Sequence, residues 1–249
     1  MQKRLTCAMD IGEQMLVNGA EVHRVEDSVK RMCTAFGFAR IDVFIITSSM
    51  VVTVTDGEES YTQTRRIKNI GTDFEKLHRL NDLSRKICST SMTVEEIRRI
   101  FENILHQKPY PFWIECPAYA IISGAFALFF GGTLCDAAVS FAIGALICGV
   151  IYLAERAKMN KIFIKFSCCF AATILAIVAL KVGIILMLDK VLIGNIMTLI
   201  PGIGLTNALR DLFTGDSIAG LLRLIEAVLT ALALAAGYFA AVFIFGGAL

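Results

Sequence analysis

Residues 194–226 read GNIMTLIPGIGLTNALRDLFTGDSIAGLLRLIE, and this stretch decides the fold. It begins and ends in apolar, helix-length runs, but its middle carries Pro201, Gly202 and several charged side chains. Proline removes a backbone donor and clashes with the preceding turn, so a helix through Pro201 must kink or break. A broken helix at membrane depth, followed by charges, is the usual sequence sign of a transporter's binding site. The pattern therefore predicts a membrane transport protein with its site in this segment.

The composition divides the chain into two parts. Of its 249 residues, 56% are hydrophobic, and the mean hydropathy of +0.66 is too high for an ordinary soluble domain. Charges are concentrated early, because 16 of the 24 Lys and Arg and 15 of the 22 Asp and Glu precede Pro111. We therefore expect a small cytoplasmic α+β domain over residues 1–110 and a transmembrane helical domain over 111–249. A net charge of +2 without a basic stripe among aromatics gives no sign of nucleic-acid binding.

The charged part contains patterns of both helices and strands. Apolar spacing predicts helices at about 6–36, 72–89 and 93–107, and β-rich runs at about 40–47, 50–55 and 60–67. Within the first helix, Asn18-Gly19 is a candidate kink. Asp56-Gly57 is a hairpin turn signal between the last two strands. Thr93 and Glu96 have the spacing of a capping box, which satisfies backbone donors at a helix start. The predicted order is thus α-β-β-β-α-α.

The apolar part predicts a helical bundle of about five spans. A span needs about 20 mostly apolar residues, and the segments that qualify are roughly 113–131, 134–153, 163–186, 190–209 and 218–246. Lys and Arg favour the cytoplasmic side of a membrane. They are abundant in the N-terminal domain and in the loop after the second span, so both are expected on the cytoplasmic side. We therefore expect a multi-pass protein of the inner membrane with its N-terminus in the cytoplasm. Asp136 is expected at the outer, solvated end of the second span. Whether 190–209 crosses fully is left open.

The break is expected near the middle of the membrane. Pro201 lies about 11 residues into the fourth span, and at about 1.5 Å per residue that is roughly half of a hydrocarbon core about 30 Å thick. After the break, a second half-helix would present its N-terminal N–H groups. Such an N-terminus attracts carboxylates through these donors and through its dipole.

Two sets of residues are predicted to make up the site. The predicted substrate-binding residues are Pro201, Gly202, Thr206, Asn207, Arg210 and Arg223. The predicted proton-coupling residues are Asp211, Asp216 and Glu226. Mixed charge of this kind suits a small zwitterion, because arginine pairs with a carboxylate and an acid holds an ammonium group or a proton.

Structural explanations for the same charges stay open. Arg210, Asp211 and Asp216 could lie in a solvated cytoplasmic loop. Arg223 and Glu226 are spaced i,i+3 and could form a purely structural bridge. A charge inside an apolar helix costs about 2.5–3.5 kcal/mol on insertion scales, which favours a functional role for Arg223 and Glu226.

Enzyme chemistry and metal binding find little support. The sequence holds no G-x-S-x-G, no H-E-x-x-H and no P-loop. Its three histidines are far apart, and its eight cysteines form no C-x-x-C pair, so we expect no catalytic residues, no metal, no cofactor and no disulfide. Two other classes stay open: a membrane-anchored enzyme with its chemistry in the N-terminal domain, and a structural or regulatory membrane subunit. Small residues at Ser140, Gly144 and Gly149 are typical of close helix packing.

Four runs of sequence carry a resemblance to a known family. The run at 194–227, GNIMTLIPGIGLTNALRDLFTGDSIAGLLRLIEA, resembles the signature of the threonine/serine exporter family. NGAEVHRVEDSVKRMCTAFGF at 18–38, RRIKNIGTDFEKLHRLNDLSR at 65–85 and LFFGGTLCDA at 128–137 resemble the N-terminal component of that family. The motif P-G…T-N-A-x-R-D…G-D…G is the specific part of the match.

The resemblance implies a partner and a substrate class. It implies a bacterial inner-membrane exporter in which this domain works with a second, smaller membrane domain, fused or separate. Because the sequence stops after five predicted spans, the resemblance implies the split form with a separate small membrane subunit. Threonine and serine are the implied substrates, and dicarboxylates such as succinate are the alternative, since split relatives have been linked to their export. A homo-oligomer is left open.

Overall fold

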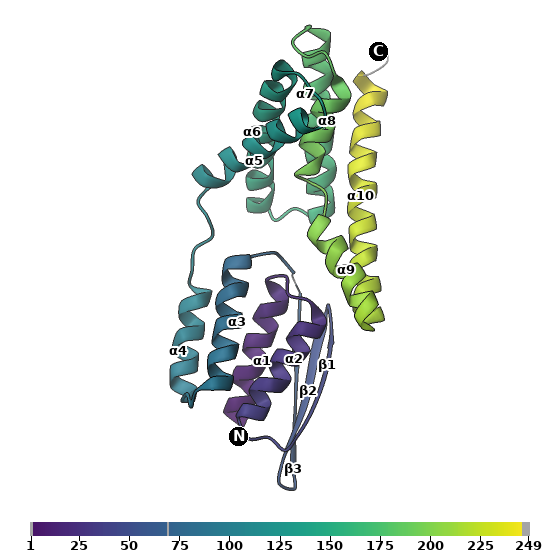
Figure 1. Cartoon of the computed structure of the whole chain (residues 1–249). Coiled ribbons are helices and arrows are strands. Elements are labelled where there is room, and N and C mark those ends of the chain that lie inside the picture. Colours follow the sequence, from purple (N-terminus) through teal and green to yellow (C-terminus); the bar gives the residue numbers. More distant parts are fainter. Residues whose placement is uncertain (1, 69, 246–249) are drawn as a thin grey trace. The chain divides into compact units, whose positions relative to one another are not determined.

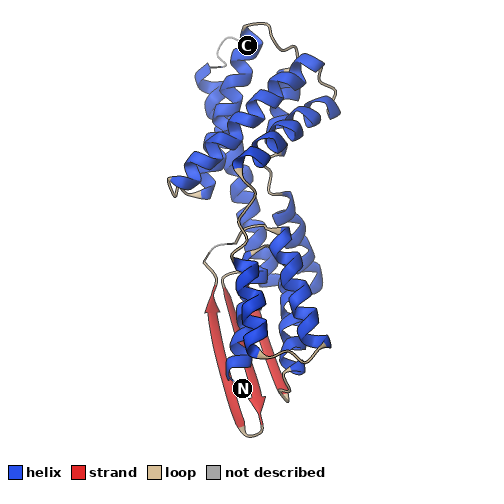
Figure 2. Cartoon of the chain, turned by 90° about the vertical axis from the view of Figure 1, so that its left-hand side faces the viewer, coloured by secondary structure: helices blue, strands red, loops and turns tan. Residues whose placement is uncertain are grey.

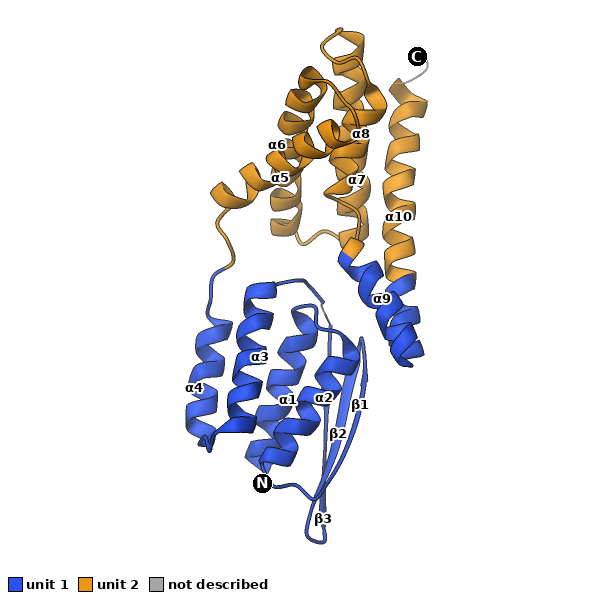
Figure 3. Ribbon diagram, viewed as in Figure 1, with its two compact units in different colours: residues 1–108, 203–224 blue, residues 109–202, 225–249 orange. Residues whose placement is uncertain are grey.

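The computed structural model describes residues 2–68 and 70–245. These divide into two units, which Figure 3 colours separately: residues 1–108 with 203–224, and residues 109–202 with 225–249. The first boundary lies close to residue 110, where the composition changes. The segment 203–224 belongs with the charged N-terminal part, although its sequence follows three apolar spans. The first unit therefore contains most of the stretch quoted above.

The N-terminal part of the first unit, up to residue 108, folds into helices and a small sheet (Figure 1). Its elements are α1 (Gln2–Val17), α2 (Val22–Ala35), β1 (Arg40–Ile46), β2 (Ser49–Asp56), β3 (Glu59–Arg66), α3 (Phe74–Ser89) and α4 (Val94–Leu105). The strands pair antiparallel in the order β1-β2-β3, with Val43 opposite Val52. Gly57 has φ +62° in the turn between β2 and β3, which confirms the predicted hairpin. All the strands described lie in this unit, as Figure 2 shows in red.

The predicted single helix over 6–36 is wrong, because the chain forms two helices there. Gly19 ends α1 with φ +96°, a left-handed conformation that glycine adopts without steric cost. The Gly19 N–H donates to the Leu16 carbonyl and the Ala20 N–H to the Met15 carbonyl, at 3.1 and 3.0 Å. These two hydrogen bonds together form the Schellman motif, which ends a helix. Residues 18–22 form the turn into α2, and we call them the α1–α2 corner.

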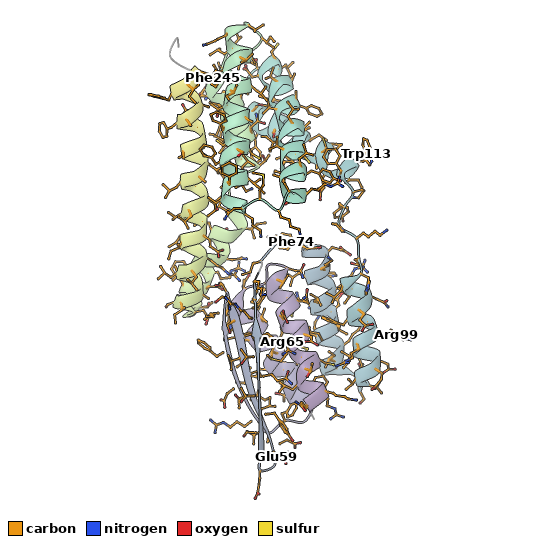
Figure 4. The ribbon with its side chains drawn as sticks, turned by 180° about the vertical axis from the view of Figure 1, so that it is seen from behind. Glu59, Arg65, Phe74, Arg99, Trp113 and Phe245 are labelled. Carbon is orange, nitrogen blue, oxygen red and sulfur yellow. The ribbon has the colours of Figure 1, made fainter. Side chains whose placement is uncertain are left out.

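The core of the first unit lies between the helices and the sheet. Its fully buried side chains come from α1, α2, β2 and α3, and include Leu5, Met9, Met15, Val25, Val29, Met32, Met50, Val52 and Leu80. Arg65 on β3 (Figure 4) contacts Asp10 and Glu13 of α1, with N–O distances of 3.1 and 3.6 Å. These ion pairs tie the edge of the sheet to the helix layer. At the start of α4, Thr93 and Glu96 form the predicted capping box.

The second unit is helical. It contains α5 (Phe112–Phe129), α6 (Leu134–Arg156), α7 (Lys161–Lys181), α8 (Leu188–Met197) and most of α10 (Ser217–Phe245), while α9 (Gly202–Thr214) belongs to the first unit. Among the described residues, four helices are long and apolar enough to cross a membrane, or five if α8 and α9 count as one bent span. This agrees with a membrane helical bundle of four or five spans. The predicted end of the last span, residue 246, lies outside the described residues.

The helix interruption falls where proline predicts it. α8 ends at Met197 and α9 begins at Gly202, directly after Pro201. Pro201 cannot donate a backbone hydrogen bond and its ring excludes a continuous helix. At the other end of the apolar part, Trp113 near the start of α5 is 83% exposed (Figure 4). An exposed tryptophan there suits the membrane surface.

Asp136 is buried, and the expectation that it is solvated is wrong. Its Oδ2 accepts hydrogen bonds from the backbone N–H and the hydroxyl of Thr133, both at 2.8 Å. Its Oδ1 accepts from the N–H groups of Leu186 and Met187, at 2.9 and 3.3 Å. Four donors compensate for the loss of water around the carboxylate. Asp136 therefore fixes the connection between α7 and α8 to the start of α6.

Candidate functional site

The signature segment folds into a tight hairpin of α9 and the start of α10. Gly215 has φ +97°, and the N–H of Asp216 donates to the Asp211 carbonyl at 2.9 Å, which ends α9 as a Schellman motif. At Gly220, a Cβ atom would lie 2.8 Å from the Ala208 carbonyl oxygen and 2.7 Å from Cγ of Leu212. Only glycine permits this approach of the two helices. The two glycines thus explain two positions of the motif, and they bring the start of α10 beside α9.

The hairpin forms a buried ion pair between Asp211 and Arg223. Their side chains are 1% and 7% exposed, and Nε of Arg223 lies 3.4 Å from Oδ2 of Asp211. Arg223 also donates from Nη2 to the Ala20 carbonyl at 2.7 Å. The backbone N–H of Val22, the first residue of α2, interacts with the Asp211 carboxylate as well. Within the described part of the chain, neither Asp211 oxygen makes a hydrogen bond of standard geometry. The carboxylate is held by charge and by the N-terminus of α2.

Two further signature residues contact the α1–α2 corner. Asn207 lies one turn before Asp211 on the same face of α9, and its Nδ2 donates to the Gly19 carbonyl at 3.3 Å. Arg210 forms an ion pair with Glu21, whose side chain is 15% exposed. Each corner residue from 19 to 22 is therefore contacted by a different signature side chain. Figure 3 shows α9 and the start of α10 in the colour of residues 1–108.

The corner is also held by the segment before α3. The Gly71 N–H donates to the Val17 carbonyl at 2.8 Å, and the Asp73 N–H donates to the Asn18 carbonyl at 3.2 Å. A Cβ at Gly19 would lie 3.1 Å from the Gly71 carbonyl oxygen. The backbone that receives Asn207 and Arg223 is therefore fixed from its other side. This makes the corner a defined binding surface for the hairpin.

A second acidic group lies on α2 in the same unit. Oε1 of Glu26 accepts a hydrogen bond from the Ile45 N–H at 3.0 Å. Burial raises the pKa of Glu26, the Ile45 N–H acts in the opposite direction, and the charge of Asp216 raises the pKa again. Among the residues that the structure describes, none provides a hydrogen-bond partner for the buried Oδ2 of Asp216. A hollow of about 390 Å³ adjoins Glu26, lined by His23, Glu26, Asp27, Lys30, Ile41, Asp42 and Val43.

The structure brings some of the predicted site residues together and not others. Asn207, Arg210, Asp211 and Arg223 meet at the corner, and Asp216 interacts with Glu26. The residues at the break are less enclosed: Pro201 is half-buried, and Gly202 and Thr206 are exposed. Glu226 is exposed and falls in the second unit, so the bridge considered between Arg223 and Glu226 is replaced by the pair with Asp211. The substrate and proton roles of these residues stay predictions.

The sequence did not predict that the signature side chains contact residues 19–22 of the α1–α2 corner. The signals were present separately, since Asn18-Gly19 marks a helix break and both 18–38 and 194–227 carry family-like runs. Nothing in the spacing relates residues about 190 positions apart. Among residues 2–68 and 70–245, no group of three His, Cys, Asp or Glu side chains is placed to hold a metal ion. All eight cysteines are free thiols, and five are buried.

Comparisons with known proteins agree on one family. The model of the family described as "Putative threonine/serine exporter" matches residues 6–245. The chain is 24% identical over 234 residues to the "Probable threonine/serine exporter" of Mycobacterium tuberculosis, covering 91% of this chain and 43% of that protein. It is 23% identical over 234 residues to the "Threonine/serine exporter" of Corynebacterium glutamicum, covering 90% and 48%. The chain thus spans less than half the length of these two relatives.

A third relative has nearly the same length as this chain. The "Probable succinate transporter subunit YjjP" of Klebsiella aerogenes is 23% identical over 241 residues, which cover 93% of this chain and 90% of that protein. No solved structure matches the chain. The family match covers both units and includes the hairpin and the corner that it contacts. The chain belongs to the threonine/serine exporter family.

Proposed function

We propose that this chain is one subunit of a secondary exporter of small amino acids, with threonine and serine as its substrates. The family match over residues 6–245 supports this, and so does the name of the Corynebacterium relative, "Threonine/serine exporter". The exporter sits in the bacterial inner membrane, with the N-terminal α+β part in the cytoplasm and efflux driven by the proton gradient. The proposed transport involves no catalytic step, because the family is one of transporters.

The exporter needs a second, small membrane subunit. The two exporter relatives are more than twice as long as the region that they share with this chain. The Klebsiella relative, which matches over 90% of its own length, is named a transporter subunit. That name supports a division of the transport unit between two polypeptides. A copy of this chain is the other partner to consider.

The observation that carries the mechanism is the buried Asp211–Arg223 pair. Arg223 is held by one carboxylate at 3.4 Å and by the Ala20 carbonyl. An amino-acid substrate also presents a carboxylate, and arginine binds such groups through paired donors. In the proposed cycle, the substrate separates the pair from the cytoplasmic side, with its carboxylate on Arg223 and its ammonium group on Asp211. A proton from outside then displaces the ammonium group from Asp211, the substrate leaves, and release of this proton to the cytoplasm restores the pair.

Asn207, Arg210 and Thr206 then surround the bound substrate. Arg210 has its own partner in Glu21, so it holds the corner while Arg223 changes partner. Pro201 and Gly202 form the hinge at which α9 adjusts, because α8 ends at Met197, α9 begins at Gly202, and the proline ring excludes a continuous helix between them. Asp216 and Glu226 are the further candidates for the coupling proton.

Efflux assays test the proposal directly. Cells that lack related exporters are loaded with a threonine-containing dipeptide, and internal threonine and serine are followed with and without this chain. We expect efflux only when a small membrane subunit encoded beside it is co-expressed. Strong efflux from this chain alone would contradict the two-subunit proposal, and no efflux under either condition would contradict the substrate.

Dicarboxylate export is the second candidate, favoured by one observation. The relative whose length this chain matches is named a succinate transporter subunit. Two arginines, Arg210 and Arg223, lie close enough to contact the same α1–α2 corner, and a dicarboxylate would use both. Succinate efflux in the same cells distinguishes the candidates.

A further inference from the structure

Strand β1 forms one edge of the sheet in the first unit, beside helix α2 (Figure 1). The turn Thr47-Ser48 joins β1 to β2, and Ile46 pairs with Ser49 across it. In a hairpin of this length, the residues next to the turn exchange both backbone hydrogen bonds, and the residues that alternate with them direct N–H and C=O away from the partner strand. The backbone groups at the open edge therefore come from Ile41, Val43 and Ile45.

Glu26 of α2 satisfies one of these edge donors. Its Oε1 accepts from the Ile45 N–H at 3.0 Å, which agrees with an N–H that points away from β2. Among the side chains that the structure describes, none accepts from the N–H of Ile41 or Val43. The hollow of about 390 Å³ lies at this edge, and Ile41, Asp42 and Val43 form its strand side. Unused backbone donors thus face a space that is large enough for a ligand.

The other side of the hollow is one face of α2. The residues that line it are His23, Glu26, Asp27 and Lys30. Their spacing of three and four positions puts all of them on the same face of the helix. Glu26 and Lys30 stand in the order that normally gives an ion pair within a helix. In the described structure they form none, because the Ile45 N–H holds Glu26 instead.

The two remaining acids of the hollow have arginine partners. Asp27 pairs with Arg31 at 2.9 Å, and Asp42 pairs with Arg40 at 3.0 Å. Neither arginine lines the hollow. A metal ion does not suit the acids, since no group of three His, Cys, Asp or Glu side chains among the described residues is placed to hold one. The hollow therefore keeps one carboxylate and one ammonium group without a partner of opposite charge.

These two groups match the two ends of a free amino acid. The Glu26 carboxylate suits an ammonium group, and the Lys30 ammonium group suits a carboxylate. Both ends can also pair with the strand edge, because Val43 presents an N–H and a C=O side by side, as it would to an added strand. The half-buried side chains of Ile41 and Val43 supply an apolar wall. A volume of about 390 Å³ lies within the range of small-molecule sites, about 300–1,000 Å³.

We propose that this hollow between α2 and β1 is a binding site for a free α-amino acid with a small side chain. The site goes beyond the proposed transport function, because it needs neither Arg223 nor any movement of the α9–α10 hairpin. It also offers a means of regulation. Glu26 interacts with Asp216 at the turn of that hairpin, and the two charges repel each other. An ammonium group on Glu26 reduces this repulsion, so the bound amino acid stabilises the hairpin on the α1–α2 corner.

Hydrogen exchange of the full chain in detergent tests the site, with L-threonine, L-alanine and L-valine as probes. Peptides from residues 39–46 report on the strand edge, and peptides from 203–224 report on the signature segment. At about ten times the Kd of a probe, the amides of Ile41 and Val43 should exchange about tenfold more slowly, because exchange then requires release of the ligand. Threoninol lacks the carboxylate and N-acetylthreonine lacks the ammonium group, so neither should protect at the same concentration.

Two variants remove one charge each from the hollow. They are Lys30→Met and Glu26→Gln, and glutamine keeps an oxygen that accepts from the Ile45 N–H. Each should weaken binding by about ten- to a hundredfold, the value of a hydrogen bond to a charged group. Lys86→Met is the matched control, because Lys86 on α3 is an exposed lysine of the same unit that does not line the hollow. It should leave the affinity unchanged. Exchange of residues 50–54 without ligand checks that every variant is folded.

The two peptide regions separate this inference from the proposed function. Protection of residues 39–46 that depends on Lys30 and Glu26 supports the site even if the chain exports no amino acid. Protection confined to 203–224 overturns it, and so does equal protection by threoninol or N-acetylthreonine. Wild-type affinity in both charge variants, or no protection of 39–46 by any of the three amino acids, overturns it as well.

Discussion

Breaking the Asp211–Arg223 pair should release the α9–α10 hairpin from the α1–α2 corner. The variants are Asp211→Leu and Arg223→Met, which replace each charge with an apolar side chain. Each leaves the other charge buried and unpaired, at a cost of about 3–5 kcal/mol. Since each 1.4 kcal/mol is about a factor of ten, local opening should become about a hundred- to several-thousand-fold more frequent.

Hydrogen exchange measures this opening at the place where it occurs. Backbone amides in residues 18–26 exchange when the corner opens, and the Val22 N–H that interacts with Asp211 is among them. The double variant Asp211→Leu/Arg223→Met removes both charges, so its exchange should return most of the way to the wild-type rate. The full chain in detergent is used throughout.

A second ion pair on α2 is the control. Arg31 and Asp27 are closer than the buried pair, with a 2.9 Å N–O distance against 3.4 Å, but they are 71% and 50% exposed. A surface pair of this kind is worth at most about 1 kcal/mol, so Arg31→Met should change exchange by less than tenfold. If Arg31→Met opens the corner as much as Arg223→Met, or if the effects of the two buried substitutions simply add, burial does not decide the strength of the pair and the reasoning fails.

Three further predictions follow from single residues. Burial raises the pKa of Glu26 above its ordinary 4.5, so the stability this group contributes is complete below pH 4.5 and is lost as pH rises through the folded pKa; Glu26→Gln should abolish that loss in thermal unfolding measured across this range. Gly220→Ala should destabilise the hairpin by about 1–3 kcal/mol through overpacking against Leu212 and Ala208. Gly149→Ala should instead be neutral or stabilising by up to about 1 kcal/mol, because no described atom beyond its chain neighbours and its own helix backbone lies within 4 Å of the added Cβ. Denaturant unfolding of both proteins checks this. A reporter active only in the cytoplasm should work when fused near residue 110 or 160 and fail after Leu249, and activity at all three positions would mean an even number of spans.

Local patterns were sufficient for most of the elements. The three strands, the turn at Gly57 and the capping box at Thr93 each depend on residues within a few positions of one another. The first helix was misjudged because apolar spacing continues through the corner, while the positive φ of Gly19 reverses the chain direction. A glycine signal shows where a helix can end, and tertiary contacts decide whether it does.

The partners of the charged residues could not be predicted from spacing. Arg223 has Glu226 one turn ahead, and helix geometry alone favours that pair. The hairpin at Gly215 instead returns the chain so that Arg223 meets Asp211, and Arg223 also reaches Ala20, 203 positions earlier. Asp136 shows the same limit in the second unit, since two of its four donors come from residues 50 positions away. Which charge is buried depends on such long-range contacts.

Asp136 also sets an order of events during synthesis. Its Oδ2 gains both donors from Thr133 as soon as the first turn of α6 forms, because the contacts are local. Its Oδ1 has to wait for Leu186 and Met187, after α7 has been made. Until then, Oδ1 of Asp136 lies at the turn of the nascent α5–α6 hairpin without the two hydrogen-bond donors that it has in the complete protein. The arrival of the α7–α8 connection therefore completes the hydrogen bonding of Asp136, and a chain that ends before residue 186 leaves Oδ1 of Asp136 without these two donors.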